Sequence, residues 1–431
     1  MITVEQLQAA IHKRVETFNQ ADYPLSARAL EQVELLACQN QILGEDIASP
    51  FDVPRQNISA MDGFAFAKGS SLEAGNSITI IGESQAGSPF VGTLNADQGV
   101  RIFTGAVVPL ACDTVEMQEN TNFADIKDTL DKSKPYSITL NKAVKLKNNI
   151  RYQGEEIAKD EAVLSRGKRL NPTDISLLAN LGIAKVSVYK PLTIGLLSTG
   201  DELVAIGEPL THQAQIYNSN TPTLKSLLKP LPITINDYGI IPDDLSATTQ
   251  AVAQAMSECD VLISTAGVSV GDYDFLTTVI EQLGKINHYK VAMKPGKPFV
   301  FGELTQNLDT PVLYFGLPGN PLSAVVGALN LVIPALWQMT GALASETPKT
   351  LQLTATLLDD VKKSPGRVDF QRGILSQDES GAYQVSVFKS QQSHRIKQLS
   401  QANCLVVLAK DSGSAAAGSQ VQVQPFPWLL A

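Results

Sequence analysis

Three short glycine-containing loops in the second half of the chain hold the residue types best able to bind a ligand. They cover residues 197–203, 264–271 and 316–323 and read LSTGDEL, STAGVSVG and GLPGNPLS. Each follows a short apolar run, and an apolar run that ends in a glycine-rich turn is typical of a buried parallel strand. In a doubly wound sheet such turns gather at the carboxyl ends of the strands, where ligands bind. Glycine lets the backbone approach a ligand, and free N–H groups at helix starts favour anions. This edge is therefore predicted to bind a phosphorylated or oxyanionic group.

Carboxylates follow three apolar runs that lead toward the same edge. They are Asp201 with Glu202, Asp243 with Asp244, and Asp272 with Asp274. Oxygen ligands suit Mg²⁺, which normally takes one or two carboxylates and shares its shell with substrate phosphates. The alternative is that residues such as Asp201 and Asp243 cap helices or turns. The convergence of three pairs on one edge favours a metal or phosphate site.

A stiff loop at residues 294–298, with the sequence KPGKP, carries two lysines. Its two prolines and its glycine restrict the backbone, so the ammonium groups of Lys294 and Lys297 would be held in place. Fixed cations lower the cost of gathering negative charge at a reacting phosphate or oxyanion. The alternative is a surface hairpin with solvated lysines.

Four further segments combine turn signals with polar side chains. Three of them fit either a ligand site or an ordinary turn: residues 59–65 (SAMDGFA), 104–106 (TGA) and 154–156 (GEE). At residues 366–373 (GRVDFQRG), strand alternation puts Arg367 and Asp369 on one face, where they would pair with each other. Residues 391–395 (QQSHR) could meet an anion.

Composition excludes several classes of protein. The chain has 431 residues, 44% hydrophobic and 18% charged, as in multidomain globular proteins. Its net charge of −9 argues against nucleic-acid binding. No signal-peptide pattern is present at the start, and the longest apolar stretch, residues 324–337, is too short to span a membrane. The four cysteines are scattered without a CxxC pair, which fits a reducing cytoplasm. Neither the dinucleotide fingerprint nor a P-loop occurs.

Hydrophobic periodicity predicts the elements that position these residues. Residues 4–18 and 26–36 are expected to be helical, and short alternating runs at residues 51–144 favour a small β domain. Residues 145–190 are mixed, with a helix around residues 173–181. Residues 191–344 alternate strand and helix, as an α/β domain does. Residues 345–431 favour a small barrel or sandwich.

Taken together and in order, these segments resemble the molybdopterin molybdenumtransferase family, the MoeA-type enzymes related to the E domain of gephyrin. The resemblance spans nearly the whole chain, and eight motifs in one order are highly specific. The matching stretches are SAMDGFA at 59–65, RIFTGA at 101–106, GEE at 154–156, STGDEL at 198–203, STAGVSVGDYD at 264–274, KPGKP at 294–298, GLPGNPLSA at 316–324 and GRVDFQRG at 366–373.

The resemblance implies a multidomain α/β plus β homodimer. Residues 1–50 and 145–190 would form a discontinuous elongated linker and dimerisation domain, with residues 51–144 as an inserted β domain. Residues 191–344 would form a molybdopterin-binding doubly wound α/β domain, and residues 345–431 a C-terminal β-barrel. The implied reaction inserts molybdate into adenylylated molybdopterin and releases AMP with Mg²⁺. The implied protein partners are the molybdopterin adenylyltransferase and molybdoenzyme-maturation proteins, with no nucleic acid and no membrane.

The resemblance also assigns roles to individual residues by motif. The acidic and hydroxyl groups of the catalytic set would be Asp62, Thr104, Glu156, Glu202, Asp244 and Asp274. The ligand site would be lined by Ser198, Thr199, Gly200, Gly267, Ser269, Lys294, Lys297, Pro318, Gly319, Asn320, Pro321 and Ser393. The metal ligands would be Glu202, Asp243, Asp244 and Asp274.

Two positions depart from the family pattern. The family usually has two glycines where this chain has Ala266-Gly267, and alanine is awkward if position 266 requires a positive φ. The family commonly has Asp where this chain has Glu156, which keeps a carboxylate one methylene farther out. Two other functions stay open: a molybdopterin adenylyltransferase or nucleotide pyrophosphatase on the same α/β domain, or a non-catalytic pterin-binding scaffold.

Overall fold

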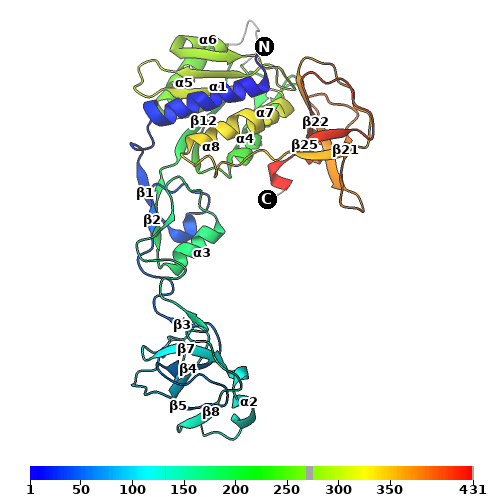
Figure 1. Cartoon of the computed structure of the whole chain (residues 1–431). Coiled ribbons are helices and arrows are strands. Elements are labelled where there is room, and N and C mark those ends of the chain that lie inside the picture. Colours follow the sequence, from blue (N-terminus) through cyan, green and yellow to red (C-terminus); the bar gives the residue numbers. More distant parts are fainter. Residues whose placement is uncertain (132, 268–274, 430–431) are drawn as a thin grey trace. The chain divides into compact units, whose positions relative to one another are not determined.

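The computed structural model describes residues 1–131, 133–267 and 275–429, and these form two compact units (Figure 1). The larger unit comprises Met1–Glu45, Arg166–Ala179 and Ile183–Ala431. The smaller unit comprises Asp46–Ser165 and Asn180–Gly182. The predicted division into finer domains stays a prediction.

The larger unit is built on a six-stranded sheet. In sheet order the strands are β15 (Ile233–Ile241), β12 (Leu192–Thr199), β16 (Val261–Thr265), β20 (Val312–Leu317), β19 (Val300–Leu304) and β17 (Gly284–Tyr289). The first four run parallel to one another, β19 pairs antiparallel with β20, and β17 pairs antiparallel with β19. Strands β16 and β20 are buried along their whole length, which explains their continuous apolar sequences.

Helices cover both faces of this sheet (Figure 1). Side chains of one strand alternate between the faces, so Ile263 packs in one apolar cluster and Leu262 in the other. The first cluster includes residues of α1 (Val4–Thr17), α4 (Asn220–Leu228), α7 (Pro321–Gly327) and α8 (Ile333–Met339). The second includes residues of α5 (Leu245–Glu258) and α6 (Phe275–Leu283). This is the predicted doubly wound arrangement.

Helix α1 confirms the amphipathic pattern predicted for residues 4–18. Its buried residues are Val4, Leu7, Ile11 and Val15, and Thr3 and Gln6 form a capping box at its start. A π-helical turn, η1 (Phe18–Asp22), continues it.

The helix predicted for residues 26–36 was wrong. Leu30–Glu34 forms strand β1, which pairs antiparallel with β11 (Lys185–Tyr189), and a short 3₁₀ turn, η2 (Leu35–Ala37), follows. A hydrogen-bonded partner strand more than 150 residues away along the chain overrides local helix propensity, and single-sequence periodicity cannot detect such a partner. The helix predicted around residues 173–181 is present as α3 (Pro172–Asn180).

A closed five-stranded barrel forms the C-terminal part of the larger unit. Its strands are β22 (Val368–Gln377), β23 (Tyr383–Val387), β21 (Leu353–Leu357), β25 (Gln420–Pro425) and β24 (Cys404–Leu408), and the β22–β24 pairing closes it. Strand β18 (Met293–Lys294) pairs parallel with β22 and so joins the lysine loop to the barrel. Helix α9 (Ile396–Gln401) precedes β24, and η5 (Pro427–Leu429) follows β25.

The smaller unit contains a five-stranded sheet. Its strands, in sheet order, are β7 (Cys112–Met117), β4 (Gly63–Ala67), β6 (Gln98–Ile102), β5 (Ser77–Ser84) and β8 (Tyr136–Thr139). Two short strand pairs accompany it, β3 (Ile58–Ser59) with β9 (Ile150–Arg151) and β2 (Ile47–Ala48) with β10 (Ala162–Leu164). The helical turns η3 (Gln118–Asn120) and α2 (Phe123–Ile126) lie between β7 and β8.

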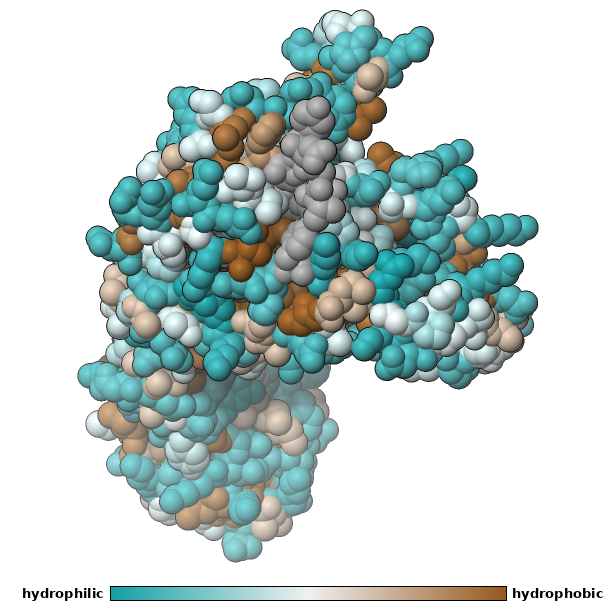
Figure 2. Space-filling view, turned by 90° about the horizontal axis from the view of Figure 1, so that it is seen from above, coloured by the Kyte–Doolittle hydropathy of each residue, from teal (hydrophilic) through white to brown (hydrophobic). Residues whose placement is uncertain are grey.

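The apolar stretch near the end of the α/β domain is longer than the sequence analysis expected. Together, α7, the π-helical turn η4 (Ala328–Val332) and α8 form one helix of 19 residues, Pro321–Met339, with a mean hydropathy of 1.6. Its length and composition would suit a membrane span, but 83% of it is buried inside the protein, as in a core helix. On the face seen in Figure 2, apolar residues form small separate patches among polar ones.

A buried carboxylate ties α1 to the antiparallel edge of the sheet. Glu303 of β19 accepts hydrogen bonds from Arg14 at 2.6 Å and from Asn287 at 2.7 Å, and Lys285 lies 3.3 Å away. Burial alone would raise the pKa of Glu303, but these hydrogen bonds and the positive charges outweigh it and hold the pKa below its usual value.

We predict that Glu303→Gln removes an acid-sensitive part of the stability. Because the pKa of Glu303 is depressed in the folded state, its stabilisation is present above the unfolded pKa of about 4.3 and is lost as pH falls through the folded value. Urea unfolding should show a deficit of at most about 3 kcal/mol at neutral pH, which shrinks below pH ~4. A deficit that does not change with pH would contradict this account.

Candidate functional site

The carboxyl edge of the parallel sheet is held together by a buried network of hydroxyl and amide groups. The Ser198 hydroxyl at the end of β12 lies 2.8 Å from the Thr265 hydroxyl at the end of β16 and 3.0 Å from that of Thr221 in α4. Asn218 donates to both Ser198 and Thr221, at 3.1 and 3.0 Å. These contacts fix the loop after β12, the loop after β16 and the start of α4 relative to one another.

Two glycines at this edge have a positive φ, a backbone conformation that residues with side chains rarely adopt. Gly200 has φ +143°, and a Cβ there would lie 2.5 Å from the Glu202 carboxylate. Gly267 has φ +67°, and a Cβ there would lie 2.8 Å from Leu276 Cβ. Thr199, the residue before Gly200, is buried. The backbone of both loops therefore follows paths that need glycine.

Ala266 has the positive φ that makes alanine awkward, with a value of +71°. The loop nevertheless keeps its anchor, because the Ala266 N–H donates to the Leu317 carbonyl at 3.0 Å. The left-handed conformation costs an alanine about 1 kcal/mol. The residue at which the loop departs from the family sequence is therefore also a residue with a strained backbone.

Three carboxylates influence one another at the same edge. The Asp243 N–H donates to the Asp201 carboxylate at 3.1 Å. Burial, followed by the negative charges of Asp201 and Glu202, raises the pKa of Asp243. Like charges gathered in this way would be relieved by a cation.

Asp244 has a structural role at the start of α5. Its carboxylate accepts a hydrogen bond from the Ala247 N–H at 2.8 Å, so it caps the helix. Helix capping was the alternative role predicted for Asp243. The structure shows that Asp244, the next residue, is the one that caps the helix. Within residues 1–131, 133–267 and 275–429, no cluster of three or more potential metal ligands forms. Ser269, Asp272 and Asp274 lie outside the described residues.

The third glycine loop carries the start of the long core helix. Pro318 is buried, whereas Gly319 and Asn320 are exposed. Asn320 is the N-cap of α7 and Pro321 its first residue, a position that suits proline because no N–H is needed there. The Asn220 side chain donates to the Gly319 carbonyl at 2.8 Å. The second and third loops are also joined directly, because the Ala266 N–H donates to the Leu317 carbonyl.

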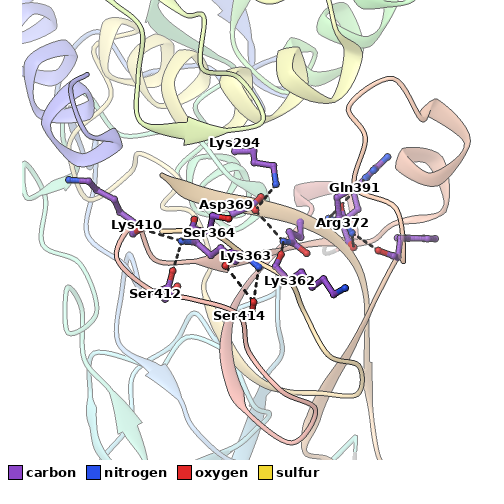
Figure 3. Close-up of polar contacts among 12 residues, drawn as sticks. Lys294, Lys362, Lys363, Ser364, Asp369, Arg372, Gln391, Lys410, Ser412 and Ser414 are labelled. Carbon is purple, nitrogen blue, oxygen red and sulfur yellow. Dashed lines mark hydrogen bonds and ion pairs between the residues drawn. The ribbon is translucent and has the colours of Figure 1, made fainter. Parts of the chain in front are cut away.

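The two lysines of residues 294–298 have different surroundings. Lys294 lies 3.1 Å from Asp369 of the barrel, and Gln371 donates to the same carboxylate oxygen at 3.2 Å (Figure 3). Asp369 therefore pairs with Lys294, not with Arg367 as strand alternation predicted. Lys297 is exposed, with its side chain in no ion pair found within the described part of the chain.

Ser393 lies on a barrel loop that is organised around a buried arginine. The Arg372 guanidinium donates to the carbonyls of Ser390, Gln392 and Arg395 at 2.9–3.1 Å, and Gln391 accepts from the Arg372 N–H (Figure 3). Burial lowers the pKa of Arg372. The half-buried Ser393 is thus presented by a loop whose backbone is held at three points.

The motifs of the smaller unit come together around Asp62. The Asp62 carboxylate accepts from the Thr104 N–H at 2.7 Å and from the Thr104 hydroxyl at 2.8 Å. These two hydrogen bonds, and then the charge of Arg101, lower the pKa of Asp62. Both residues are exposed. An exposed carboxylate held in its ionised form is available to a ligand.

Glu156 belongs to the same region of the smaller unit. The pairing of β3 with β9 joins the segment before Asp62 to the segment before Glu156, and the Ser59 N–H donates to the Ala106 carbonyl. The Glu156 N–H donates to Val53, and its carboxylate is exposed. Three motifs that are separate in sequence thus share one part of the fold.

Comparison with known proteins identifies the family. The MoeA N-terminal region (domain I and II) matches residues 2–182, the probable molybdopterin binding domain residues 195–338, and the MoeA C-terminal region (domain IV) residues 354–426. A molybdopterin molybdenumtransferase from Haemophilus influenzae is 38% identical over 430 residues, covering 100% of both chains. The chain belongs to the MoeA family of molybdopterin molybdenumtransferases.

A second relative supports the family assignment, and a solved structure supports the fold. A molybdopterin molybdenumtransferase from Staphylococcus aureus (strain MSSA476) is 34% identical over 395 residues, covering 89% of this chain and 88% of that one. The crystal structure of the molybdopterin biosynthesis MoeA protein from Pyrococcus horikoshii OT3 has a TM-score of 0.76 at 24% identity, covering 99% of this chain and 100% of that chain. The predicted family and fold class are confirmed.

The sequence did not point to several residues of this candidate site. Asn218, Asn220 and Thr221 hold the sheet edge, and Arg372 holds the Ser393 loop. The segment NSNT at residues 218–221 precedes a helix, which is a capping signal, but nothing in it indicates contacts with loops 20 to 100 residues away.

We predict that Thr104→Val raises the pKa of Asp62 partway toward its ordinary value. Valine removes the hydroxyl donor and leaves the backbone N–H in place. The measurement is a carboxylate NMR titration of protein labelled with ¹³C-aspartate. Thr104→Ser, which keeps the hydroxyl, is the control and should match the wild type. An unchanged pKa in the valine variant would refute the contribution of the hydroxyl.

Proposed function

We propose that this chain, an enzyme of molybdenum cofactor biosynthesis, inserts molybdate into adenylylated molybdopterin with Mg²⁺-dependent release of AMP. The observation that carries the proposal is the carboxyl edge of the parallel sheet. There, glycine loops lie beside carboxylates, and burial together with the negative charges of Asp201 and Glu202 raises the pKa of Asp243. Backbone N–H groups suit phosphate and pterin, and crowded carboxylates suit a divalent cation.

The donor set at this edge fits Mg²⁺. Glu202 and Asp243 would hold the ion, with Asp244 and Asp274 as the further ligands that the family resemblance implies. Two carboxylates match the usual Mg²⁺ site, in which substrate phosphates and water complete the shell. Bound there, Mg²⁺ would neutralise negative charge on the phosphoanhydride of the substrate.

The chain's own residues would orient the substrate and gather charge. The buried Ser198–Thr265–Thr221 network keeps the loops around Gly200, Gly267 and Gly319 at fixed separations. Lys297, exposed on its proline-restricted loop, supplies a positive charge for molybdate or a substrate phosphate. Within the smaller unit, Asp62 is an exposed carboxylate that Thr104 holds in its ionised form.

The deciding experiment incubates the purified protein with adenylylated molybdopterin, Mg²⁺ and molybdate, and follows AMP release. We expect release that requires both Mg²⁺ and molybdate. Formation of adenylylated molybdopterin from molybdopterin and ATP would instead indicate an adenylyltransferase. Binding of the pterin without any AMP release would indicate a scaffold.

We predict that Asp62→Asn folds and loses molybdate-dependent AMP release by at least about tenfold. Asparagine preserves the turn and removes the charge. Circular dichroism and melting temperature should match the wild type, which separates loss of function from loss of fold. Wild-type turnover in this variant would show that Asp62 serves only the turn.

We predict that Lys297→Gln and Lys294→Gln differ in their effects. Lys297→Gln should lower molybdate-dependent turnover and its sensitivity to salt at an unchanged melting temperature. Lys294→Gln should also lower the melting temperature, because it leaves the buried Asp369 carboxylate without its cation. Normal turnover in both variants would refute the anion-binding role.

The resemblance further supports a homodimer in the cytoplasm that works with the molybdopterin adenylyltransferase and with molybdoenzyme-maturation proteins. Sedimentation equilibrium measures the oligomeric state directly. A monomer at all accessible concentrations would overturn the dimer proposal.

A further inference from the structure

The side chain of Asn220 connects two loops of the sheet edge. Asn220 is the first residue of α4, and its Nδ2 donates to the Gly319 carbonyl at 2.8 Å. The residue is 92% buried, since its relative exposure is 8%. The contact thus joins the start of one helix to the loop that precedes another.

This hydrogen bond sets the orientation of the peptide plane between Gly319 and Asn320. A trans peptide bond is planar, with its C=O and its N–H pointing in opposite directions. When Asn220 holds the Gly319 carbonyl, the Asn320 N–H must point away from Asn220. Glycine is the residue whose peptide would otherwise rotate most freely, so the position needs an external anchor.

The Asn320 N–H is available to a ligand. It donates to no acceptor found among the described residues, and Asn320 is exposed. The next residue, Pro321, has no N–H, so Asn320 provides the outermost backbone donor at the start of the 19-residue helix. An oriented donor at this position suits an anionic oxygen.

Burial of Asn220 also costs folding free energy, which its contact with Gly319 must offset. Its Oδ1 is buried and has no hydrogen-bond partner within the described part of the protein. An unsatisfied buried acceptor destabilises a fold, so a role in folding alone explains this residue poorly. Costs of this kind concentrate at functional sites, where geometry matters more than stability.

We propose that Asn220 is a positioning residue that aims the Asn320 N–H at an anionic oxygen of the nucleotide-bearing substrate. The proposal rests on the proposed function, which brings a phosphorylated substrate to this edge. Asn220 itself touches no substrate; it acts through the Gly319–Asn320 peptide. Loss of its Nδ2 donor therefore weakens substrate binding without removing any group that contacts the substrate.

The test compares two substitutions that affect the donor differently. Asn220→Ala removes it, and Asn220→Asp replaces it with an oxygen that repels the Gly319 carbonyl when ionised and donates to it when protonated. We expect Asn220→Ala to raise KM for adenylylated molybdopterin about tenfold, the usual effect of one hydrogen bond to a charged group, with a smaller change in kcat.

Binding of AMP, measured by calorimetry from pH 8 to pH 5, supplies a readout that does not depend on turnover. Asn220→Asp should bind AMP more weakly than Asn220→Ala at pH 8 and should recover relative to it as pH falls and the carboxyl group protonates. A purely structural role would not produce this recovery. The AMP phosphate also titrates over this pH range. Dividing the AMP affinity of Asn220→Asp by that of Asn220→Ala at the same pH cancels this effect.

Asn330→Ala is the matched control. Asn330 is equally buried and donates its Nδ2 to the Val326 carbonyl at 2.9 Å, but it lies inside the long helix, away from the edge. This variant should lose stability and keep the wild-type KM and AMP affinity. If Asn220→Ala does not fold, the pH dependence of Asn220→Asp, compared with the wild type, carries the test.

Two results would overturn the inference. One is wild-type AMP affinity in Asn220→Ala, and the other is an AMP affinity of Asn220→Asp that stays in constant ratio to that of Asn220→Ala at every pH. Failure of the proposed function looks different, because the wild-type protein itself would then release no AMP with molybdate and Mg²⁺.

Discussion

The geometry of the sheet edge depends on a buried hydrogen-bond network among Ser198, Thr265, Thr221 and Asn218. Parallel strands place their carboxyl ends side by side, but they do not fix the loops that follow. In this protein the loops are fixed by hydroxyl and amide groups buried where water cannot compete for their hydrogen bonds. A fully paired network of this kind favours one arrangement, because any alternative would leave a buried polar group without a partner. The glycine loops are therefore presented at set distances before a ligand arrives.

Charge is distributed unevenly over this framework. Carboxylates crowd together at Asp201, Glu202 and Asp243, whereas Lys294 and Lys297 lie on the strand-and-loop segment that joins the barrel. A ligand with both an oxyanion and a bound cation would satisfy both groups, although the whole protein carries a net charge of −9. An anionic ligand would thus meet local positive charge even though the protein as a whole is acidic.

Much of the fold could be predicted because it follows from local patterns. The buried strands β12, β16 and β20 are nearly continuous apolar runs, and α1 has clear amphipathic spacing with a capping box. Strand β1 could not be predicted, because its conformation depends on pairing with β11. Among the candidate residues, glycines and acids marked the sheet-edge loops of the larger unit and, separately, the Asp62–Thr104 region of the smaller unit. Asn220 and Arg372 were not, because a side chain's contact with a distant carbonyl leaves no pattern in the sequence.

The pairing of Lys294 with Asp369 has a thermodynamic consequence for the barrel. The ammonium group of Lys294 pairs with Asp369 of β22 and is close to half exposed, so an anion that reached it would compete with Asp369. Linkage requires reciprocity: the free energy by which the anion loosens this tether equals the free energy by which the tether opposes anion binding. Anion binding at Lys294 and the Lys294–Asp369 ion pair would therefore be linked, so that changing either one shifts the other.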